Sequence, residues 1–230
     1  MLRIPEPELM DEATQAKAYA EADFSESHNR VVAFFREIFP SFPSKGSFLD
    51  LGCGPGDVTI RFARAYPEAS LVGVDGAQAM LDIAAKASQN DPQLRERLSW
   101  ICSYIPSPSI PETHYDAIIS NSLLHHLHEP LNMWRFIAQI ADPNTYIFIT
   151  DLRRPDSIEM AHAIVTTQAT HAPEILQKDF FNSLCASFTI KEVETQLASA
   201  NLEGLNVVPL GEIHLAVYGS LLRFADGTRT

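Results

Sequence analysis

The stretch Phe48-Leu-Asp-Leu-Gly-Cys-Gly-Pro-Gly56 decides the fold of this chain. An apolar run leads directly into a turn with three glycines, and a helix-forming segment begins near Asp57. Glycine allows sharp backbone turns and lets a ligand approach closer than any Cβ would permit. The succession of strand, glycine-rich turn and helix therefore predicts a nucleotide-type binding loop.

Further short apolar runs alternate with amphipathic stretches after Gly46. This alternation is typical of a parallel sheet whose crossover helices cover both faces. The predicted strands are Phe48–Leu51, Leu71–Val74, Leu98–Cys102, Ala117–Ser120 and Tyr146–Thr150. The predicted helices between them are Asp57–Tyr66, Gln78–Ser88 and Leu131–Ile140. We therefore expect a doubly wound, Rossmann-like α/β fold.

The order of the elements changes beyond Asp151. Two helices are predicted in succession, at Asp156–Thr170 and Pro173–Ala186. A capping box formed by Thr189 and Glu192 predicts a further helix that reaches Ala200. Two strands with a tight turn at Gly211 follow, at Val207–Leu210 and Ile213–Tyr218. We therefore expect a seven-stranded, mostly parallel sheet that ends in an antiparallel C-terminal hairpin.

The composition limits the class of partner. Seventeen Lys and Arg against 29 Asp and Glu give a formal net charge of −12, which disfavours a nucleic-acid substrate. No apolar run is long enough for a signal peptide or a membrane span, so we expect a cytoplasmic protein. We expect it to be a monomer or a homodimer. The three cysteines are far apart and odd in number, and we expect them to be reduced thiols.

Two acidic residues indicate the kind of ligand. Asp75 ends the strand after the glycine turn, about twenty residues on, where a carboxylate can accept hydrogen bonds from both ribose hydroxyls. A dinucleotide loop has the pattern G-x-G-x-x-G, whereas here the third glycine comes one residue early and Asp50 precedes the turn. These features predict a nucleoside ligand and favour a cation or amine over a diphosphate beside the loop.

In combination, several segments resemble class I S-adenosylmethionine-dependent methyltransferases, a subgroup similar to the ubiquinone/menaquinone and small-molecule methyltransferases. The segments are Asp50–Gly56, Val74–Gly76, Met80–Leu81 and Tyr115–His126, and the resemblance covers residues 46–151. It implies S-adenosylmethionine as cofactor and S-adenosylhomocysteine as product. It also implies in-line methyl transfer to a small-molecule acceptor, at a nitrogen, oxygen, sulfur or carbon atom that the sequence does not identify.

The resemblance assigns cofactor contacts to residues at the ends of four predicted strands. It places three glycines around the methionine and ribose, Asp50 near the amino group, Asp75 at the ribose hydroxyls, and Asn121 near the methionine. The adenine would lie along Gly76 and Met80. The third strand departs from the family, because Ser103, followed by Tyr104, stands where an Asp commonly contacts the adenine amine. The predicted cofactor-binding residues are Asp50, Gly52, Gly54, Gly56, Asp75, Gly76, Met80, Ser103, Tyr104 and Asn121.

Three residues are candidates for the chemistry of the acceptor. Tyr19 lies in an N-terminal segment that in similar enzymes folds over the cofactor. His126 or its neighbour His125 can act as a base or touch the substrate, and Asp151 follows the fifth strand at the edge where such folds bind ligands. The predicted catalytic residues are Tyr19, His126 and Asp151.

Each candidate also has a structural interpretation. Tyr19 can pack in an amphipathic helix, and the histidines can have a purely structural role in the connection after the fourth strand. Asp151 can cap a helix or pair with Arg153 or Arg154, which themselves either bind an anionic substrate or are solvated. Neighbouring histidines do not easily converge on one ion, and no carboxylate or cysteine stands at a ligand spacing, so we expect no metal.

We expect one methyltransferase domain, because 230 residues suffice for one sizeable core. Its parts are a helical N-terminal lid (1–46), a cofactor-binding core (47–151), a helical substrate-pocket insertion (152–188) and a C-terminal helix with hairpin (189–230). Within the lid, helices are predicted over Leu9–Tyr19 and Asn29–Phe39. The two additions 1–46 and 152–188 favour an enzyme over a non-catalytic S-adenosylmethionine-binding module. A methyltransferase that acts on a peptide remains an alternative, and the glycine spacing argues against a nicotinamide-dependent oxidoreductase.

Overall fold

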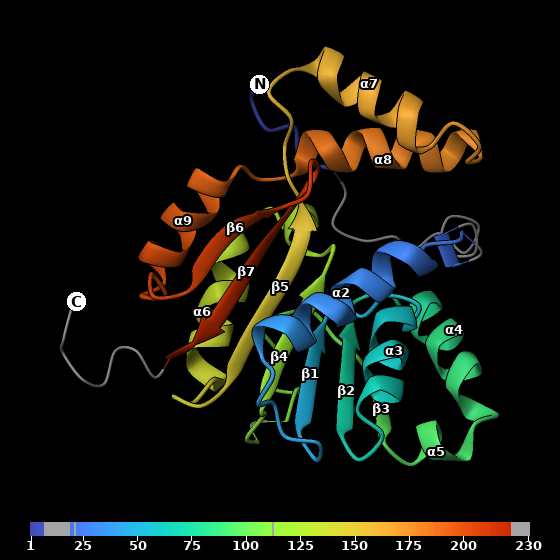
Figure 1. Ribbon diagram of the computed structural model, residues 1–230, viewed down its shortest axis with the longest axis vertical. Helices are drawn as coiled ribbons and strands as arrows, with labels where there is room; N and C mark the ends of the chain where they lie inside the picture. Colours follow the sequence, from blue (N-terminus) through green and yellow to red (C-terminus); the bar gives the residue numbers. More distant parts are fainter. Residues whose placement is uncertain (7–18, 21, 112, 222–230) are drawn as a thin grey trace.

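A seven-stranded sheet forms the centre of the protein, in the strand order β3-β2-β1-β4-β5-β7-β6 (Figure 1). The computed structural model describes residues 1–6, 19–20, 22–111 and 113–221. Strands β1 to β5 are parallel, and β7 is antiparallel to both of its neighbours, β5 and β6. The strands are β1 (Ser47–Leu51), β2 (Ser70–Asp75), β3 (Leu98–Cys102), β4 (Ala117–Asn121), β5 (Tyr146–Leu152), β6 (Asn206–Leu210) and β7 (His214–Ser220). The predicted sheet, with its antiparallel C-terminal hairpin, is confirmed.

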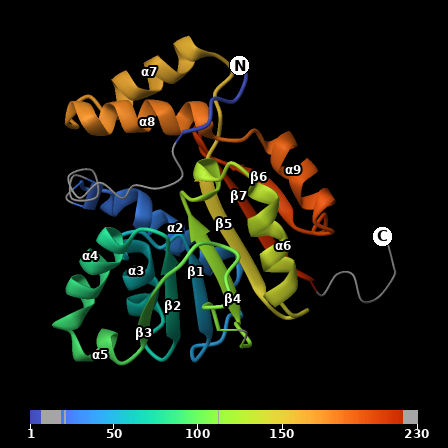
Figure 2. The same ribbon diagram turned by 180° about the vertical axis from the view of Figure 1, so that it is seen from behind.

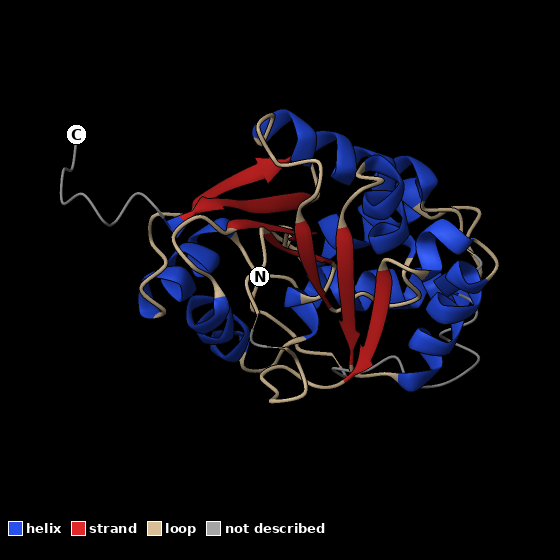
Figure 3. Ribbon diagram, turned by 90° about the horizontal axis from the view of Figure 1, so that it is seen from below, coloured by secondary structure: helices blue, strands red, loops and turns tan. Residues whose placement is uncertain are grey.

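Helices cover both faces of this sheet, as the view from below shows (Figure 3). Helices α2 and α3 bury one face, and α6 and α9 bury the other. The helices are α2 (Ser25–Ile38), α3 (Asp57–Ala65), α4 (Gln78–Gln89), α5 (Pro92–Arg95), α6 (Pro130–Ile140), α7 (Ile158–Gln168), α8 (Glu174–Ala186) and α9 (Ile190–Ser199), with a short 3-10 turn η1 (Leu124–His126). This is the doubly wound arrangement that the sequence predicts.

The apolar runs of the strands supply two separate cores. Successive strand residues point to opposite faces, so that Phe48 of β1 joins an aromatic cluster under α2 while Leu49 joins the core under α6 and α9. In the aromatic cluster the ring of Phe35 contacts those of Phe48, Phe62 and Phe148. Because both faces are buried, the central strands are continuously apolar rather than alternating.

The predicted elements match the observed ones to within a few residues. Helix α2 begins four residues earlier than predicted, and α5 and η1 were not predicted. The predicted capping box at Thr189 and Glu192 is present. Thr189 Oγ1 accepts a hydrogen bond from the backbone N–H of Glu192, and the Glu192 carboxylate accepts one from the backbone N–H of Thr189. The hairpin turn has Gly211 in the left-handed region, with φ +66°. The predicted helix over 9–19 lies outside the described residues, apart from Tyr19.

Helices α7 and α8 form a layer across the carboxyl ends of the parallel strands, visible from both sides (Figures 1 and 2). They pack on one another through a small core around Leu184 and Ala161. The edge of the sheet that carries the glycine-rich turn therefore lies beneath these two helices. This edge is where open parallel sheets bind ligands.

Residues 1–6, which we call the N-terminal strap, are extended and lie beside α8 and η1. The backbone N–H of Ile4 donates to the carbonyl of Cys185, and the Arg3 guanidinium donates to the carbonyls of Ala186, His125 and Leu127. The guanidinium also lies 4.1 Å from the ring centre of Phe188. The strap therefore ties the helical layer to the sheet. Across the described part of the chain, every helix is too short or too polar to cross a membrane.

Candidate active site

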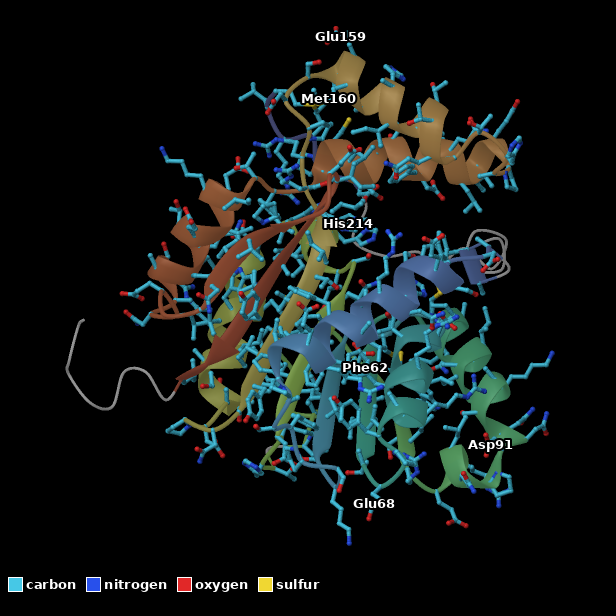
Figure 4. All side chains as sticks on the ribbon, in the orientation of Figure 1. Phe62, Glu68, Asp91, Glu159, Met160 and His214 are labelled. Carbon is cyan, nitrogen blue, oxygen red and sulfur yellow. The ribbon has the colours of Figure 1, made fainter. Side chains whose placement is uncertain are left out.

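A cavity of about 1390 Å³ lies between the carboxyl ends of the strands and the helical layer. Its volume exceeds the ~300–1,000 Å³ of an ordinary small-molecule pocket, so it has room for more than one ligand. The turns after β1, β2, β3 and β4 line one side, and α2, α8 and the β6–β7 turn line the other. Figure 4 labels His214 of β7 in this region, whereas Glu68 and Asp91 lie at the opposite end of the sheet.

The glycine-rich turn shapes the floor of this cavity. Gly52, Gly54 and Gly56 all have positive φ, at +70°, +53° and +82°. A Cβ at Gly56 would lie 2.8 Å from Ala84 and Trp100, and one at Gly52 would meet Leu123 at 2.7 Å, so these two glycines permit close packing. A Cβ at Gly54 would meet no protein atom within 4 Å. Gly54 therefore leaves open space where the turn faces the cavity.

Asp75, at the end of β2, is held by two backbone groups. Its two carboxylate oxygens accept hydrogen bonds from the N–H of Gly54, at 2.9 Å, and of Ala77, at 2.8 Å. Burial raises the pKa of this carboxyl, and the two hydrogen bonds oppose the shift. A carboxylate has about four acceptor sites, so each oxygen keeps one for a vicinal diol in the cavity.

Asp50 on β1 is almost fully buried, with 1% of its surface exposed. Its Oδ2 accepts a hydrogen bond of 2.6 Å from Thr59 Oγ1 of α3. Burial raises the pKa of Asp50 to about 7, against the hydrogen bond from Thr59. A cationic amine beside it would favour the ionised form, so the residue suits a positively charged group better than an anion.

The other predicted cofactor residues also lie around the cavity. Met80 is buried beside Ala77, and the backbone N–H of Ser103 donates to the carbonyl of Asp75. The Ser103 hydroxyl donates to the Tyr104 carbonyl, and Tyr104 is 61% exposed. Nine of the ten predicted residues line the cavity: Asp50, Gly52, Gly54, Asp75, Gly76, Met80, Ser103, Tyr104 and Asn121. Gly56 does not line it, although its neighbours Pro55 and Asp57 do.

Asn121 at the end of β4 is fixed in place by its neighbours. Its Oδ1 accepts a hydrogen bond of 2.8 Å from Thr150 Oγ1, and its Nδ2 donates to Ser122 Oγ at 3.2 Å. Ser122 itself has φ +56°, an unusual conformation for a residue other than glycine. Strain of this kind is found mostly at ligand-binding turns, and here it redirects the chain from β4 into η1 at the cavity wall.

Asp151 pairs with His125 and with neither of the neighbouring arginines. Its Oδ1 lies 2.6 Å from His125 Nδ1, and both side chains are buried. Burial lowers the pKa of His125, but the charge and hydrogen bond of Asp151, together with Glu6, outweigh burial and raise it. The predicted alternative of a pair with Arg153 or Arg154 is therefore wrong.

Arg154 is buried in a structural network and is not solvated. It donates to the carbonyl of Ser187 and to the Glu192 carboxylate, at 2.7 Å, while Arg153 donates to the carbonyl of Glu212. Both arginines line a separate cavity of about 280 Å³. Arg153 and Arg154 therefore do not line the large cavity, and their position excludes them from binding an anionic substrate there.

Glu6 is a residue of this site that the sequence did not indicate. Its Oε1 accepts a hydrogen bond of 2.9 Å from Ser183 and lies 3.5 Å from His125 Nε2 and 3.3 Å from His126 Nδ1. No carboxylate stands at a ligand spacing from the histidines in the sequence, and the fold brings one from about 120 positions away. Only the fold of the N-terminal strap reveals this contact.

Tyr19 lies at the mouth of the cavity and packs on Phe24, with ring centres 5.0 Å apart. Burial raises the pKa of Tyr19 to about 12, with further contributions from Asp57, Asp151 and Asp75. The phenol is therefore neutral at physiological pH. Tyr19 and His126 line the same cavity, and Asp151 reaches it through His125.

His214 on β7 lines the cavity and was not predicted. Burial lowers its pKa, and the nearby Asp151 carboxylate opposes that shift. The imidazole is therefore neutral near pH 7 and offers a lone pair to the cavity. Its position in the last strand, far along the sequence from the glycine-rich turn, gave no local signal of a role in the site.

The comparison with protein families decides which family the chain represents. A family model described as "Methyltransferase domain" matches residues 22–207, which is most of the chain. The chain belongs to the methyltransferase-domain family. The match spans β1 to β5 as well as α7, α8 and α9, so the family relationship includes the helical layer over the cavity. The resemblance found in the sequence is thereby confirmed.

Relatives of this methyltransferase domain include two proteins of known name. Over 134 residues it is 34% identical to a trans-aconitate 2-methyltransferase from Variovorax paradoxus, covering 57% of this chain and 47% of that protein. Over 146 residues it is 27% identical to the mitochondrial ubiquinone biosynthesis O-methyltransferase of Schizosaccharomyces pombe, covering 62% and 51%. The chain spans about half the length of the curated relatives it matches.

Solved structures share the fold of this methyltransferase domain at low sequence identity. A putative S-adenosyl-L-methionine-dependent methyltransferase from Methanococcus maripaludis superimposes with a TM-score of 0.69 at 18% identity, covering 94% of this chain and 96% of that one. The plantazolicin methyltransferase BpumL, solved with a pentazolic desmethylPZN analog and SAH, gives a TM-score of 0.66 at 18% identity, covering 90% and 88%. The class I, Rossmann-like fold is therefore shown.

Proposed function

We propose that this protein transfers the methyl group of S-adenosylmethionine to a small-molecule acceptor. The observation that carries the proposal is the Asp75 carboxylate, which two backbone N–H groups hold with an acceptor site left on each oxygen. That arrangement fits the two hydroxyls of a ribose. SAH is bound in solved neighbours that share the fold.

The residues present fit the ribose, the amine and the base of the cofactor. Gly54 leaves open space beside Asp75, where a Cβ would stand in the way of a ribose. Asp50 is buried next to the turn and suits the ammonium group of the methionine part. Met80 and Tyr104 provide apolar surface for the adenine. These contacts account for the ribose, amine and base with residues of the described chain.

Bound S-adenosylmethionine supplies an activated methyl group, whose S–C bond breaks as a new bond to the acceptor forms, with the electron pair remaining on sulfur. The protein then has to align the acceptor and exclude water, and good alignment is worth ~7 kcal/mol or more of the barrier. The helical layer of α7 and α8 covers the acceptor side. Neutral His214, and His126 beside Glu6, are positioned to accept a proton from the acceptor.

The charges around the cavity favour an uncharged or cationic acceptor. Among the described residues that line it, Arg30 is the one Lys or Arg, and it pairs with Glu26 at 2.7 Å. The acceptor side carries carboxylates, Asp179 and Glu212, and apolar side chains such as Leu176 and Phe180. A polycarboxylate, as named for the trans-aconitate relative, would meet no guanidinium there. We therefore propose an amine, a phenol or another neutral acceptor.

Calorimetric titration with S-adenosylmethionine and SAH tests the proposal. We expect micromolar binding to the wild type and its loss in Asp75→Ala, with Asp82→Ala as a matched control on the exposed surface of α4. Folded wild-type protein that binds neither compound would contradict the proposal. Production of SAH that requires an added neutral or cationic acceptor would then separate an enzyme from a non-catalytic binding module.

A further inference from the structure

Three potential metal ligands converge beneath the helical layer, from two parts of the chain that are far apart in sequence. They are Glu6 of the N-terminal strap and the adjacent His125 and His126 of η1. Each residue offers one potential ligand atom, and the three atoms lie within 4.8 Å of one another. The two histidines line the cavity, so the cluster borders the proposed acceptor site.

The spacing of these atoms is that of ligands around one small ion. In a tetrahedral site with metal–ligand bonds of ~2.0–2.2 Å, two ligand atoms stand about 3.3–3.6 Å apart. Glu6 Oε1 lies 3.5 Å from His125 Nε2 and 3.3 Å from His126 Nδ1. An ion can therefore be bound with little movement of the side chains.

A second shell of hydrogen bonds already orients two of the three ligands. His125 donates from Nδ1 to the Asp151 carboxylate, at 2.6 Å, which leaves Nε2 facing Glu6, where this nitrogen can bind an ion once it has lost its proton. A carboxylate behind a ligating histidine is the usual arrangement in zinc sites. Ser183 donates to Glu6 Oε1 at 2.9 Å and fixes the carboxylate. The strap that carries Glu6 is itself held by Arg3.

The charge of the cluster also favours a cation. Glu6 and Asp151 are two carboxylates that are largely removed from solvent. The Arg3 guanidinium donates to three backbone carbonyls and lies over the ring of Phe188. A divalent ion would neutralise both carboxylates, and buried charges are stable in proteins when they are paired or bound to a metal.

We propose that Glu6, His125 and His126 bind a divalent transition-metal ion of the zinc class. Two imidazoles and one carboxylate are the ligand set of several catalytic zinc sites, which keep a further position open. Here that position faces the cavity. If the proposed methyl transfer is correct, an acceptor hydroxyl or amine bound there would lose its proton more readily. The binding of the metal does not depend on that function.

Metal binding is tested on the whole 230-residue chain without cofactor or acceptor. Protein dialysed against a chelator is titrated with Co²⁺, followed by visible absorption, and then with Zn²⁺ in competition. We expect one ion per chain, with the strong d–d absorption of a four-coordinate Co²⁺ site and its displacement by Zn²⁺. Failure of the wild type to bind either ion would overturn the proposal, and the calorimetric test with S-adenosylmethionine would be unaffected.

Variants locate the site. Glu6→Gln and His126→Ala are expected to weaken Co²⁺ binding by at least ~10-fold, the loss typical of a disturbed metal shell. His114→Ala is the matched control, because His114 is also flanked by two carboxylates, Asp116 and Asp142, but at the other end of the sheet. Unchanged affinity in Glu6→Gln, or a loss in the control, would contradict the assignment. Circular dichroism confirms that each variant is folded.

Discussion

The carboxylate of Asp151 lies 2.6 Å from Nδ1 of His125, and both side chains are almost completely buried. Asp151 is the penultimate residue of the fifth parallel strand, and His125 lies in the turn after the fourth. The same carboxylate accepts from the backbone N–H of Leu152 at 2.6 Å and from that of His125 at 3.3 Å. One acidic side chain therefore fixes the conformation of two loops at the cavity.

Replacing Asp151 by Asn is expected to destabilise the protein by ~3 kcal/mol, because it leaves a buried imidazole without its charged partner. Urea denaturation measures the change in the free energy of unfolding. The control is Asp82→Asn, which removes an exposed carboxylate of α4 and should change that free energy by less than ~0.5 kcal/mol. Equal effects of the two substitutions would contradict a structural role for the buried pair.

Alanine substitutions at two glycines of the turn should separate stability from cofactor binding. Gly54→Ala is expected to cost only ~1–2 kcal/mol of stability for the positive φ, but to weaken S-adenosylmethionine binding at least ~10-fold, because the new Cβ enters the cavity. Gly56→Ala adds a steric clash with Ala84 and Trp100 and should cost ~3 kcal/mol. Thermal unfolding and calorimetry measure the two effects, and a Gly54→Ala protein with wild-type affinity would refute the assignment.

The affinity for S-adenosylmethionine should depend on pH through Asp50. Burial raises the pKa of this carboxyl to about 7, so its ionised fraction, and with it the attraction for an ammonium group, increases as the pH rises through 7. Between pH 6 and 7.5 the affinity is expected to increase by up to ~8-fold, before an α-amino group begins to lose its proton near pH 8. Calorimetry across this range checks the expectation, and Asp50→Asn should abolish the increase. A dependence that survives in the variant would require another group.

Asp57 should contribute to stability in a pH-dependent way. The hydrogen bond from His28, at 2.6 Å, outweighs burial and, with Arg61, lowers the pKa of Asp57 to about 2. A lowered carboxyl pKa means that the stabilisation is present above about pH 4 and is lost as the pH falls through 2. Because the side chain is nearly half exposed, we expect Asp57→Asn to cost ~1 kcal/mol at pH 6 and less at pH 3. Urea denaturation at both values tests this, and a larger difference at pH 3 would contradict it.

The fold could be predicted because its signals are local. Apolar runs, glycines and a capping box report the conformation of neighbouring residues, and their order along the chain defined the seven strands. Asp50 and Asp75 could also be predicted as site residues, because each lies at or next to the carboxyl end of its predicted strand. Their proximity to the glycine-rich turn follows from parallel pairing alone.

The acceptor side could not be predicted, since its contacts join distant parts of the chain. Glu6 meets His125 through a strap that has no apolar periodicity, and Arg154 meets Glu192 across the α7–α8 segment. A sequence offers many carboxylates for each histidine, and only the folded backbone selects one. The short helix α5 and the turn η1 were missed for a related reason: neither is long enough to show a period.

Helices α7 and α8 occupy one continuous stretch of chain between β5 and α9. The glycine-rich turn, Asp50 and Asp75 all belong to the sheet beneath and share no element with that stretch. Under the proposed function, the residues assigned to the methyl donor and the helices that cover the acceptor therefore belong to separate blocks of sequence. Randomised libraries confined to residues 158–186 would then vary the cover over the acceptor and leave the glycine-rich turn, Asp50 and Asp75 unchanged.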